Sequence, residues 1–161
     1  MNQFQLLLED KIAVFCTDDT SFLPDDSFGA IITDPPESMR GGWEAIAWMN
    51  QHNLWRLLRP EGIAIIMTNP VHGWVSIPKA DPMQSWTEID ESFAPRAEWG
   101  HPNARPVEAV AKLIALTQGP ILDPYCGSGS TLVAARDAGR AAVGIDKNKT
   151  HYDAAVARLS L

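Results

Sequence analysis

A glycine-rich turn between two apolar runs carries the clearest chemical signal in the sequence. The apolar run 120–122 ends in Asp123, and Gly127 and Gly129 follow shortly after it. A segment compatible with a helix, 131–136, comes next. Glycine lets the backbone approach a ligand closely, and the first amide groups of a helix have no helical partner. This order predicts a ligand-binding turn between the carboxyl end of a buried strand and the start of a helix.

A second carboxylate follows the next apolar run and helps to decide which ligand the turn would bind. The run 141–145 ends in Asp146, a position that suits a carboxylate accepting hydrogen bonds from ribose hydroxyls. No lysine follows Gly129, so the phosphate loop GxxxxGK[ST] is absent, and Leu132 occupies the third glycine position of GxGxxG. Asp123 would repel a pyrophosphate and attract an ammonium group. The residues therefore favour S-adenosyl-L-methionine over NAD, with a plain tight turn as the weaker alternative.

A second motif lies upstream, where the segment 31–33 is followed by Asp34-Pro35-Pro36-Glu37. Alone, this tetrapeptide is a turn signal. Together with 123–129 it resembles the amino-methyltransferases of DNA, whose catalytic motif is [DNS]-P-P-[YFW] and whose cofactor motif is D-P-F-x-G-S-G-T. The catalytic motif comes first here, which is the motif order of the beta class of that family.

Further segments match the same family in the same order. The segment 101–108 resembles H-P-x-x-K-P-x-E, with Arg105 in place of the lysine. The segments 16–18 and 23–28 resemble the approach to the catalytic strand, and 57–62 resembles L-K-P-G-G. The main matches cover roughly 12–37 and 101–160 of the chain.

The resemblance implies an α/β architecture of the Rossmann-like, S-adenosylmethionine-dependent methyltransferase type. We expect a mostly parallel sheet with helices on both faces, formed by a single domain that spans 1–161. The catalytic half would occupy about 1–70 and the cofactor-binding half about 101–161. A variable loop of about 70–100 would lie between them.

The implied catalytic group is the tetrapeptide that begins at Asp34. An exocyclic amino nitrogen is a poor nucleophile because its lone pair is delocalised into the base. The Asp34 carboxylate and the Pro35 carbonyl would accept hydrogen bonds from the two amino hydrogens, while Pro36 helps to fix the backbone. The resemblance also implies a set of cofactor-binding residues, which are Asp18, His101, Arg105, Asp123, Tyr125, Gly127, Ser128, Gly129 and Asp146. Among these, Asp146 would bind the ribose, Asp18 the adenine amino group, and Asp123 the ammonium end.

Glu37 departs from the family pattern, because the family has an aromatic residue there that stacks on a base flipped out of the helix. Such stacking is worth roughly 1–3 kcal/mol per base. Three explanations remain open at the level of sequence. Glu37 hydrogen-bonds the edge of a different substrate, Trp43 or Trp48 supplies the stacking surface, or catalysis is impaired.

Composition sets limits on partners and location. The formal net charge is −7 and the sequence pI is about 4.9, which argues against strong non-specific DNA binding by the whole surface. A local basic face remains conceivable, with Arg40, Arg56, Arg59, Lys79, Arg96 and Arg105 as candidates. The scattered histidines and two cysteines predict no metal site and no disulfide framework. No segment predicts a membrane span or secretory signal, so a cytoplasmic location is expected.

Hydrophobic patterns place strands at 11–16, 28–33, 62–68, 119–123 and 140–145, and helices at 43–58, 106–117, 129–139 and 148–159. The stretch 70–100 is the hardest to interpret. It is either a short target-recognition insertion or a surface loop with one edge strand near 86–90. About thirty residues are few for a separate recognition domain, so either this stretch reads a very short sequence or recognition is shared with a second protomer or another protein. A homodimer is the expectation that the resemblance gives.

These observations together predict a site-specific DNA methyltransferase. It would transfer the methyl group of S-adenosyl-L-methionine to an exocyclic amino group of a DNA base, with adenine favoured over cytosine. Two alternatives stay open. One is a methyltransferase of this fold that acts on a non-DNA substrate, and the other is a cofactor-binding pseudoenzyme that works as a partner subunit.

Overall fold

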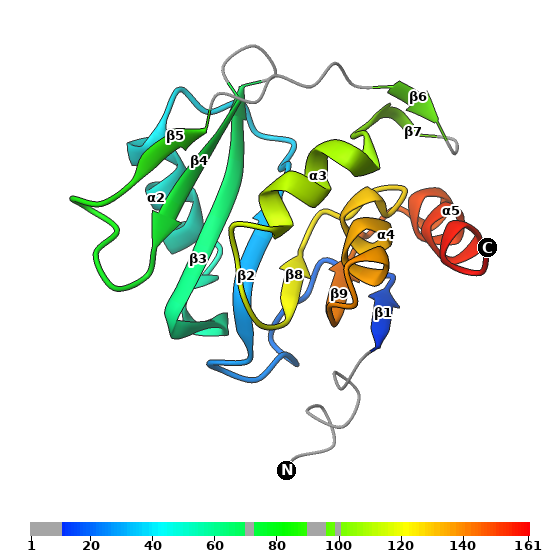
Figure 1. Ribbon diagram of the computed structural model, residues 1–161, viewed down its shortest axis with the longest axis horizontal. Helices are drawn as coiled ribbons and strands as arrows, with labels where there is room; N and C mark the ends of the chain where they lie inside the picture. The colour runs from blue at the N-terminus through cyan, green and yellow to red at the C-terminus, as the bar shows by residue number, and fades with distance from the viewer. Residues whose placement is uncertain (1–10, 70–72, 90–95, 99–100) are drawn as a thin grey trace.

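The computed structural model of the chain describes residues 11–69, 73–89, 96–98 and 101–161. Within these residues a seven-stranded sheet has the order β1-β9-β8-β2-β3-β4-β5 (Figure 1). Neighbours from β1 to β3 pair in parallel, and β4 and β5 add an antiparallel extension. The strands are β1 (Ile12–Phe15), β2 (Phe28–Thr33), β3 (Leu58–Asn69), β4 (Gly73–Pro78), β5 (Thr87–Ile89), β8 (Ile121–Asp123) and β9 (Ala142–Ile145). A separate antiparallel pair consists of β6 (Arg96–Glu98) and β7 (His101–Ala104).

Helices cover both faces of the sheet because the central strands are apolar on both sides. All six residues of β2 are buried, and residues 30–32 alternate between two cores. Ile31 packs in the core that includes α2 (Gly42–Gln51), while Ala30 and Ile32 pack in the core under α3 (Val107–Ile114) and α4 (Ser130–Asp137). The last helix, α5 (Lys149–Leu159), contacts α4 and β1. The expected Rossmann-like α/β architecture is therefore confirmed.

The helix predicted for 43–58 is shorter than expected. It ends at Gln51, because Asn53 adopts a positive φ of 52° that a continuing helix does not allow. A short 3₁₀ turn, η1 (Trp55–Leu57), follows, and β3 begins directly at Leu58. The apolar residues of this turn continued the helical periodicity in the sequence, which explains the error in the predicted end.

The stretch 70–100 contributes to the main sheet, which corrects the interpretation of this stretch as a variable loop. β4 pairs antiparallel with β3, with Trp74 opposite Met67, and β5 forms the edge. The edge strand predicted near 86–90 is present as β5, whereas β4 was not predicted. Residues 70–72, 90–95 and 99–100 lie outside the part of the chain that the structure describes.

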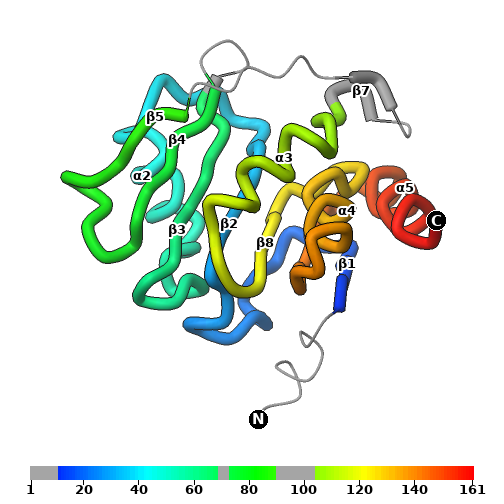
Figure 2. Tube along the Cα trace, viewed as in Figure 1, coloured from blue at the N-terminus to red at the C-terminus, as the bar shows by residue number. Residues whose placement is uncertain are grey.

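The parallel strands bring four acidic segments to one edge of the sheet. β1, β2, β8 and β9 all end there, and Asp18, Asp34, Asp123 and Asp146 lie at or just after those ends. Figure 2 shows β2 and β8 side by side although they come from opposite halves of the chain. Ligands of open α/β sheets bind at the carboxyl edge. Among the described residues, no helix has the length and apolar character that a membrane span requires.

Candidate active site at the carboxyl edge of the sheet

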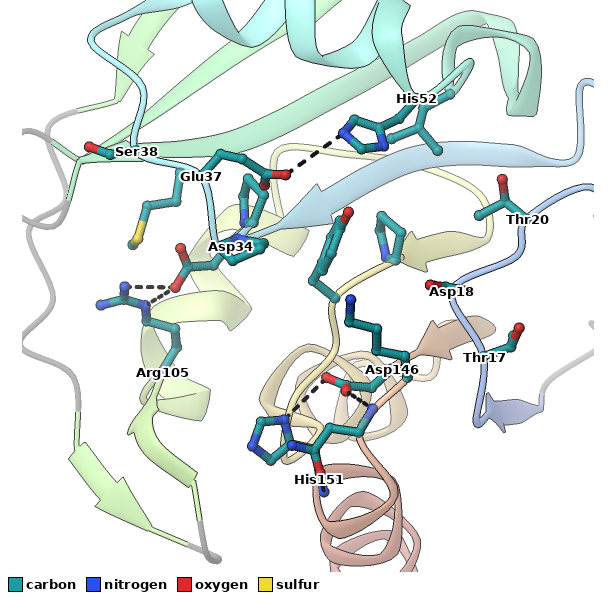
Figure 3. Close-up of a pocket in the computed structure, with 18 of the residues that line it drawn as sticks. Thr17, Asp18, Thr20, Asp34, Glu37, Ser38, His52, Arg105, Asp146 and His151 are labelled. Carbon is teal, nitrogen blue, oxygen red and sulfur yellow. Dashed lines mark hydrogen bonds and ion pairs between the residues drawn. The ribbon is translucent and has the colours of Figure 1, made fainter.

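A cavity of about 990 Å³ opens at this edge, between the loops that follow β1, β2, β8 and β9. Its described lining includes Asp18, Asp34, Glu37, Arg105 and Asp146, which Figure 3 shows around a common space. The tetrapeptide predicted to be catalytic and part of the predicted cofactor set come from distant parts of the sequence and line one cavity.

Asp34 is held by Arg105 on one side of the cavity. The Arg105 guanidinium donates from Nε at 2.8 Å and lies with Nη2 at 2.6 Å from the same oxygen, Oδ2 of Asp34 (Figure 3). Paired contacts of this kind fix the orientation of a carboxylate as well as stabilising its charge. The resemblance implied a cofactor-binding role for Arg105, which lines both cavities and also pairs with the predicted catalytic carboxylate.

Asp123 lies deeper than the sequence suggested, at the junction of β2 and β8. Its side chain accepts from Thr33 Oγ1 at 2.7 Å and from the Tyr125 amide at 3.1 Å. Asp123 is only 3% exposed, and this burial raises the pKa of its carboxyl to about 6, against the lowering effect of its hydrogen bonds. Asp123 lines a second, smaller cavity and is not among the described residues that line the large one. It connects the catalytic strand to the glycine turn.

The glycine turn has the conformation that its residues predict, but two of its amides are already used within the protein. Gly127 and Gly129 have φ values of 53° and 85°, in the region that favours glycine. The Gly127 amide donates to Asp146 Oδ2 at 3.0 Å, and the Gly129 amide donates to the Cys126 carbonyl at 2.8 Å. These two groups are therefore not open to a ligand, contrary to the sequence-based expectation. Gly129 also begins α4 and packs closely on Ala155 of α5.

Asp146 lies in the wall of the large cavity with a fixed orientation. Besides the Gly127 amide, its Oδ1 accepts from the Asn148 amide at 2.8 Å, and His151 Nδ1 lies 3.5 Å from Oδ2. Each carboxylate oxygen has a second lone pair, so hydroxyl groups of a ribose can still donate to it. His151 also lines the cavity and was not identified from the sequence.

Glu37 faces His52 across the cavity wall. Glu37 Oε1 lies 3.8 Å from His52 Nε2 (Figure 3), and both residues line the cavity. His52 in turn packs on Trp48, with 4.9 Å between the ring centroids. His52 comes from the end of α2, and nothing in the local sequence connected it with the catalytic tetrapeptide.

Neither tryptophan considered as a substitute stacking surface lines the cavity. Trp48 is 4% exposed and packs on Tyr125 at a centroid distance of 5.8 Å. Trp43 is 56% exposed and packs on Trp86 instead. Among the described lining residues, Tyr125, His52 and His151 supply the aromatic rings. The second explanation for Glu37 therefore finds no support in these two positions.

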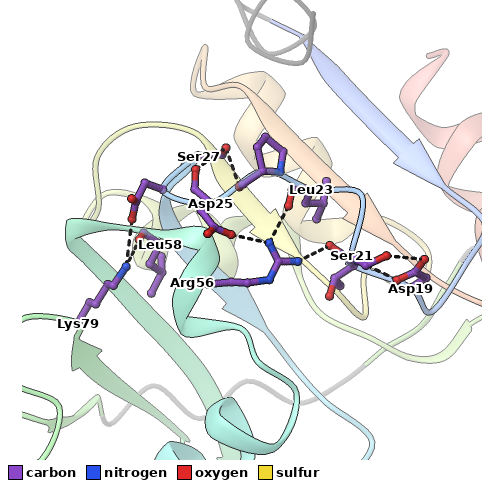
Figure 4. A network of polar contacts seen from close by, with 11 residues as sticks. Asp19, Ser21, Leu23, Asp25, Ser27, Arg56, Leu58 and Lys79 are labelled. Carbon is purple, nitrogen blue, oxygen red and sulfur yellow. Dashed lines mark hydrogen bonds and ion pairs between the residues drawn. The ribbon is translucent and has the colours of Figure 1, made fainter. Parts of the chain in front are cut away.

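The loop that carries Asp18 is fastened by Arg56. The Arg56 guanidinium donates to the carbonyls of Leu23 and Thr20, each at 2.7 Å, and to Asp25 at 2.8 Å (Figure 4). Lys79 similarly contacts Asp26, at 3.2 Å. Arg56, Lys79 and Arg105 were candidates for a basic DNA-binding face. The structure shows each of them in an internal ion pair.

The other predicted site residues line one or both cavities, except for one whose side chain the structure does not describe. Pro35 and Pro36 line the large cavity, Tyr125 lines both cavities, and Ser128 lines the small one. The backbone of His101 belongs to β7, but its side chain lies outside the described residues. Within the described part of the chain, no cluster of three or more histidine, cysteine or acidic side chains is arranged to hold a metal ion.

Comparison with known proteins identifies the family of the chain. A family model described as DNA methylase, of the N6/N4 type, matches residues 43–157. The type II methyltransferase M.ScaI of Streptomyces caespitosus is 45% identical over 53 residues, which cover 33% of this chain and 17% of that enzyme.

Two solved structures share the fold. The M1.HpyAVI–SAM complex has a TM-score of 0.63 at 19% identity, covering 94% of this chain and 100% of that one. The cytosine-N4-specific PvuII DNA methyltransferase has a TM-score of 0.64 at 13% identity, covering 91% and 86%. At these identities the structures establish the fold alone. Because the family model spans well over half of the sequence, the chain belongs to the N6/N4 DNA methylase family.

Proposed function

We propose that this protein transfers the methyl group of S-adenosyl-L-methionine to an exocyclic amino group of a DNA base. The observation that carries the proposal is the shared cavity. Asp34, at the end of β2, and the carboxylates Asp18 and Asp146, beyond the ends of β1 and β9, line the same space. A group-transfer enzyme needs this arrangement, because donor and acceptor must meet with reacting atoms close together.

The residues present fit the cofactor. Asp146 has spare acceptor capacity toward the large cavity, and Asp18 adds a second carboxylate there. Ribose hydroxyls and the adenine amino group are donors, and the sulfonium is positively charged, so an acidic cavity complements this ligand. When bound, the cofactor supplies a methyl group on an electron-poor sulfur. M1.HpyAVI, which shares the fold, was solved in complex with SAM.

Asp34 would orient and polarise the acceptor amine. Its carboxylate would accept hydrogen bonds from the amino group, which concentrates electron density on the nitrogen. As the carbon–nitrogen bond forms, the bond from the methyl carbon to sulfur breaks, the sulfur leaves as a neutral thioether, and the methylated amine loses one proton to solvent. Arg105 holds the carboxylate in one orientation before the substrate arrives, so little reorganisation is needed during the reaction. Pro35 and Pro36 restrict the backbone of the loop that carries the accepting carbonyl.

Adenine is the proposed target, although the family includes both kinds of amine and the PvuII enzyme is specific for cytosine N4. The cavity, at about 990 Å³, lies at the upper end of the range of roughly 300–1,000 Å³ for ligand sites. This volume is large enough for a base to enter beside the cofactor. Because the matched segment covers 17% of M.ScaI, the substrate of that enzyme is no guide to the target sequence.

The test is transfer of labelled methyl groups from S-adenosylmethionine to DNA of mixed sequence, followed by nucleoside analysis. We expect N6-methyladenine. Asp34→Ala removes the acceptor and should lower kcat by about 10²-fold or more, because its hydrogen bonds act mainly in the transition state. Asp137→Ala, at the exposed end of α4, is the matched control and should leave the rate unchanged.

Three other outcomes would point elsewhere. N4-methylcytosine as the product would keep the reaction and overturn the choice of base. Transfer to RNA or free nucleotides alone would favour the non-DNA methyltransferase. Bound cofactor with no transfer to any nucleic acid would favour a partner subunit.

A further inference from the structure

A second cavity lies behind the ion pair of Asp34 and Arg105. Its volume is about 60 Å³, and both members of the pair line it as well as the large cavity. Water occupies roughly 30 Å³ per molecule in the liquid, so this space suits a small polar group and excludes a nucleoside ring. The ion pair therefore forms a wall common to the two cavities.

One wall of the small cavity comes from Trp74 of β4. This side chain is 2% exposed and packs in the core under α3 and α4. Its indole N–H has no hydrogen-bond partner among the described residues. Buried donors are nearly always satisfied in folded proteins, so an unpartnered indole beside a cavity indicates a place for an acceptor.

The other walls are chemically complementary to a group that carries one positive and one negative charge. Asp123 supplies a carboxylate, and Ser128 and Thr131 supply hydroxyl groups. An α-amino acid head carries an ammonium and a carboxylate on one carbon. Its ammonium matches the Asp123 side, and its carboxylate matches an indole donor.

The resemblance implies that the ammonium end of S-adenosylmethionine lies at Asp123, which lines this small cavity. We infer that Trp74 is a further cofactor-binding residue, whose indole N–H donates to the cofactor carboxylate there. This inference rests on the proposed function and adds a binding residue from the antiparallel part of the sheet. The adenosine part then occupies the large cavity near Asp18 and Asp146. The cofactor passes the ion pair of Asp34 and Arg105, which places the sulfonium beside the predicted catalytic carboxylate.

The chain contains a matched control for this residue. Trp48 is also buried with an unpartnered indole N–H, but it lines neither cavity in the described structure. Trp74→Phe and Trp48→Phe remove the same donor from equally buried positions. A general effect on packing would appear in both variants, whereas a lost contact to the ligand would appear only in Trp74→Phe.

Two ligands that differ only in the carboxylate test the same contact from the ligand side. Decarboxylated S-adenosylmethionine keeps the sulfonium, the ribose and the adenine but lacks the carboxylate. Calorimetry should show that Trp74→Phe lowers the affinity for S-adenosylmethionine by about 10- to 100-fold, as expected for the loss of a hydrogen bond to a charged group. The same variant should change affinity for the decarboxylated ligand by less than about twofold, and Trp48→Phe should leave both affinities near those of the wild type.

A measurement on the wild-type protein covers the case in which Trp74→Phe does not fold. With ¹⁵N-labelled indoles, the Trp74 N–H resonance should move downfield on addition of S-adenosylmethionine and stay in place with the decarboxylated ligand.

If Trp74→Phe lowers the affinity for both ligands equally, or for neither, the inference is overturned while the proposed function stays intact. So would an unmoved Trp74 resonance with S-adenosylmethionine bound. A wild-type protein that binds neither ligand would overturn both proposals.

Discussion

Glu37 is the residue at which this chain differs most from its family in chemical character. The structure places it in the cavity wall opposite His52, at 3.8 Å, where a carboxylate cannot stack on a base. We expect Glu37→Tyr to raise kcat/KM on DNA by about 10-fold, because base stacking contributes roughly 1–3 kcal/mol. Single-turnover methylation assays measure this change.

The control for this substitution is Glu37→Gln, which removes the charge without adding a ring. It should not reproduce the gain. A Glu37→Tyr variant slower than the wild type would mean that the carboxylate contacts the substrate. In that case Glu37 reads a substrate other than the one the family usually methylates.

Asp123 makes the stability of the protein depend on pH. Burial raises the pKa of its carboxyl from 3.8 to about 6 in the folded state. Because the folded-state pKa is the higher one, its contribution to stability is fully present below about pH 4 and is lost as pH rises through about 6. The loss amounts to about 3 kcal/mol, at about 1.4 kcal/mol per pKa unit.

Urea unfolding of the wild type and of Asp123→Asn between pH 4 and 7.5 measures this effect. The free energy of unfolding of the wild type should fall relative to that of the variant by about 3 kcal/mol across the range. Asparagine is nearly the same size, so packing is a small part of the difference. Parallel pH profiles for the two proteins would show that the carboxyl titrates normally.

At the scale of the element, the loop between β1 and β2 depends on one side chain. Arg56 bonds to two carbonyls and one carboxylate of this loop, which also carries Asp18. We expect Arg56→Met to weaken cofactor binding by about 5- to 10-fold, since the loop must then be ordered by the ligand. kcat at saturating cofactor should change little, because no contact to Asp34 is lost.

Calorimetry and urea unfolding together test this role of Arg56. Loss of its hydrogen bonds should also lower the free energy of unfolding, by about 1–3 kcal/mol. Lower stability with unchanged cofactor affinity would show that Arg56 supports the fold without positioning the binding loop.

Elements that depend on local sequence patterns could be predicted, whereas elements and contacts that depend on residues far apart in the chain could not. β2, β8 and β9, with the helices that follow β8 and β9, have local apolar periods, so the sequence predicted them closely. β4 was missed because its pairing with β3 is a tertiary contact. The carboxylates Asp34 and Asp146 were predicted from strand ends and from the resemblance, whereas the pairing of Arg105 with Asp34 joins residues far apart in the chain.

At the scale of the whole molecule, charge limits how DNA is held. The net charge is −7, and three of the candidate basic residues, Arg56, Lys79 and Arg105, are engaged in ion pairs within the protein. We expect the protein alone to bind duplex DNA weakly. When the logarithm of the DNA-association constant is plotted against the logarithm of the salt concentration, the slope should correspond to about three phosphate contacts or fewer.

Fluorescence anisotropy between 50 and 200 mM salt measures this slope. A steep slope would show a basic surface that the described residues do not account for. Cooperative binding, which becomes tighter as the protein concentration increases, would instead support the homodimer, in which a second copy contributes to DNA binding. A separate recognition partner would restore affinity only when it is added.

The place of β1 in the sheet has a consequence for the order of folding. β1 lies at an edge and pairs with β9, so residue 12 meets residue 142. Such distant contacts form late, because the entropy of closing the intervening chain is lost before the contact is gained. Asp18 follows β1 and Asp146 follows β9, so these two carboxylates come together only when this pairing forms. During synthesis, β2 and β3 can therefore assemble first, and a nascent chain halted before residue 140 would contain Asp34 but could not bind the cofactor.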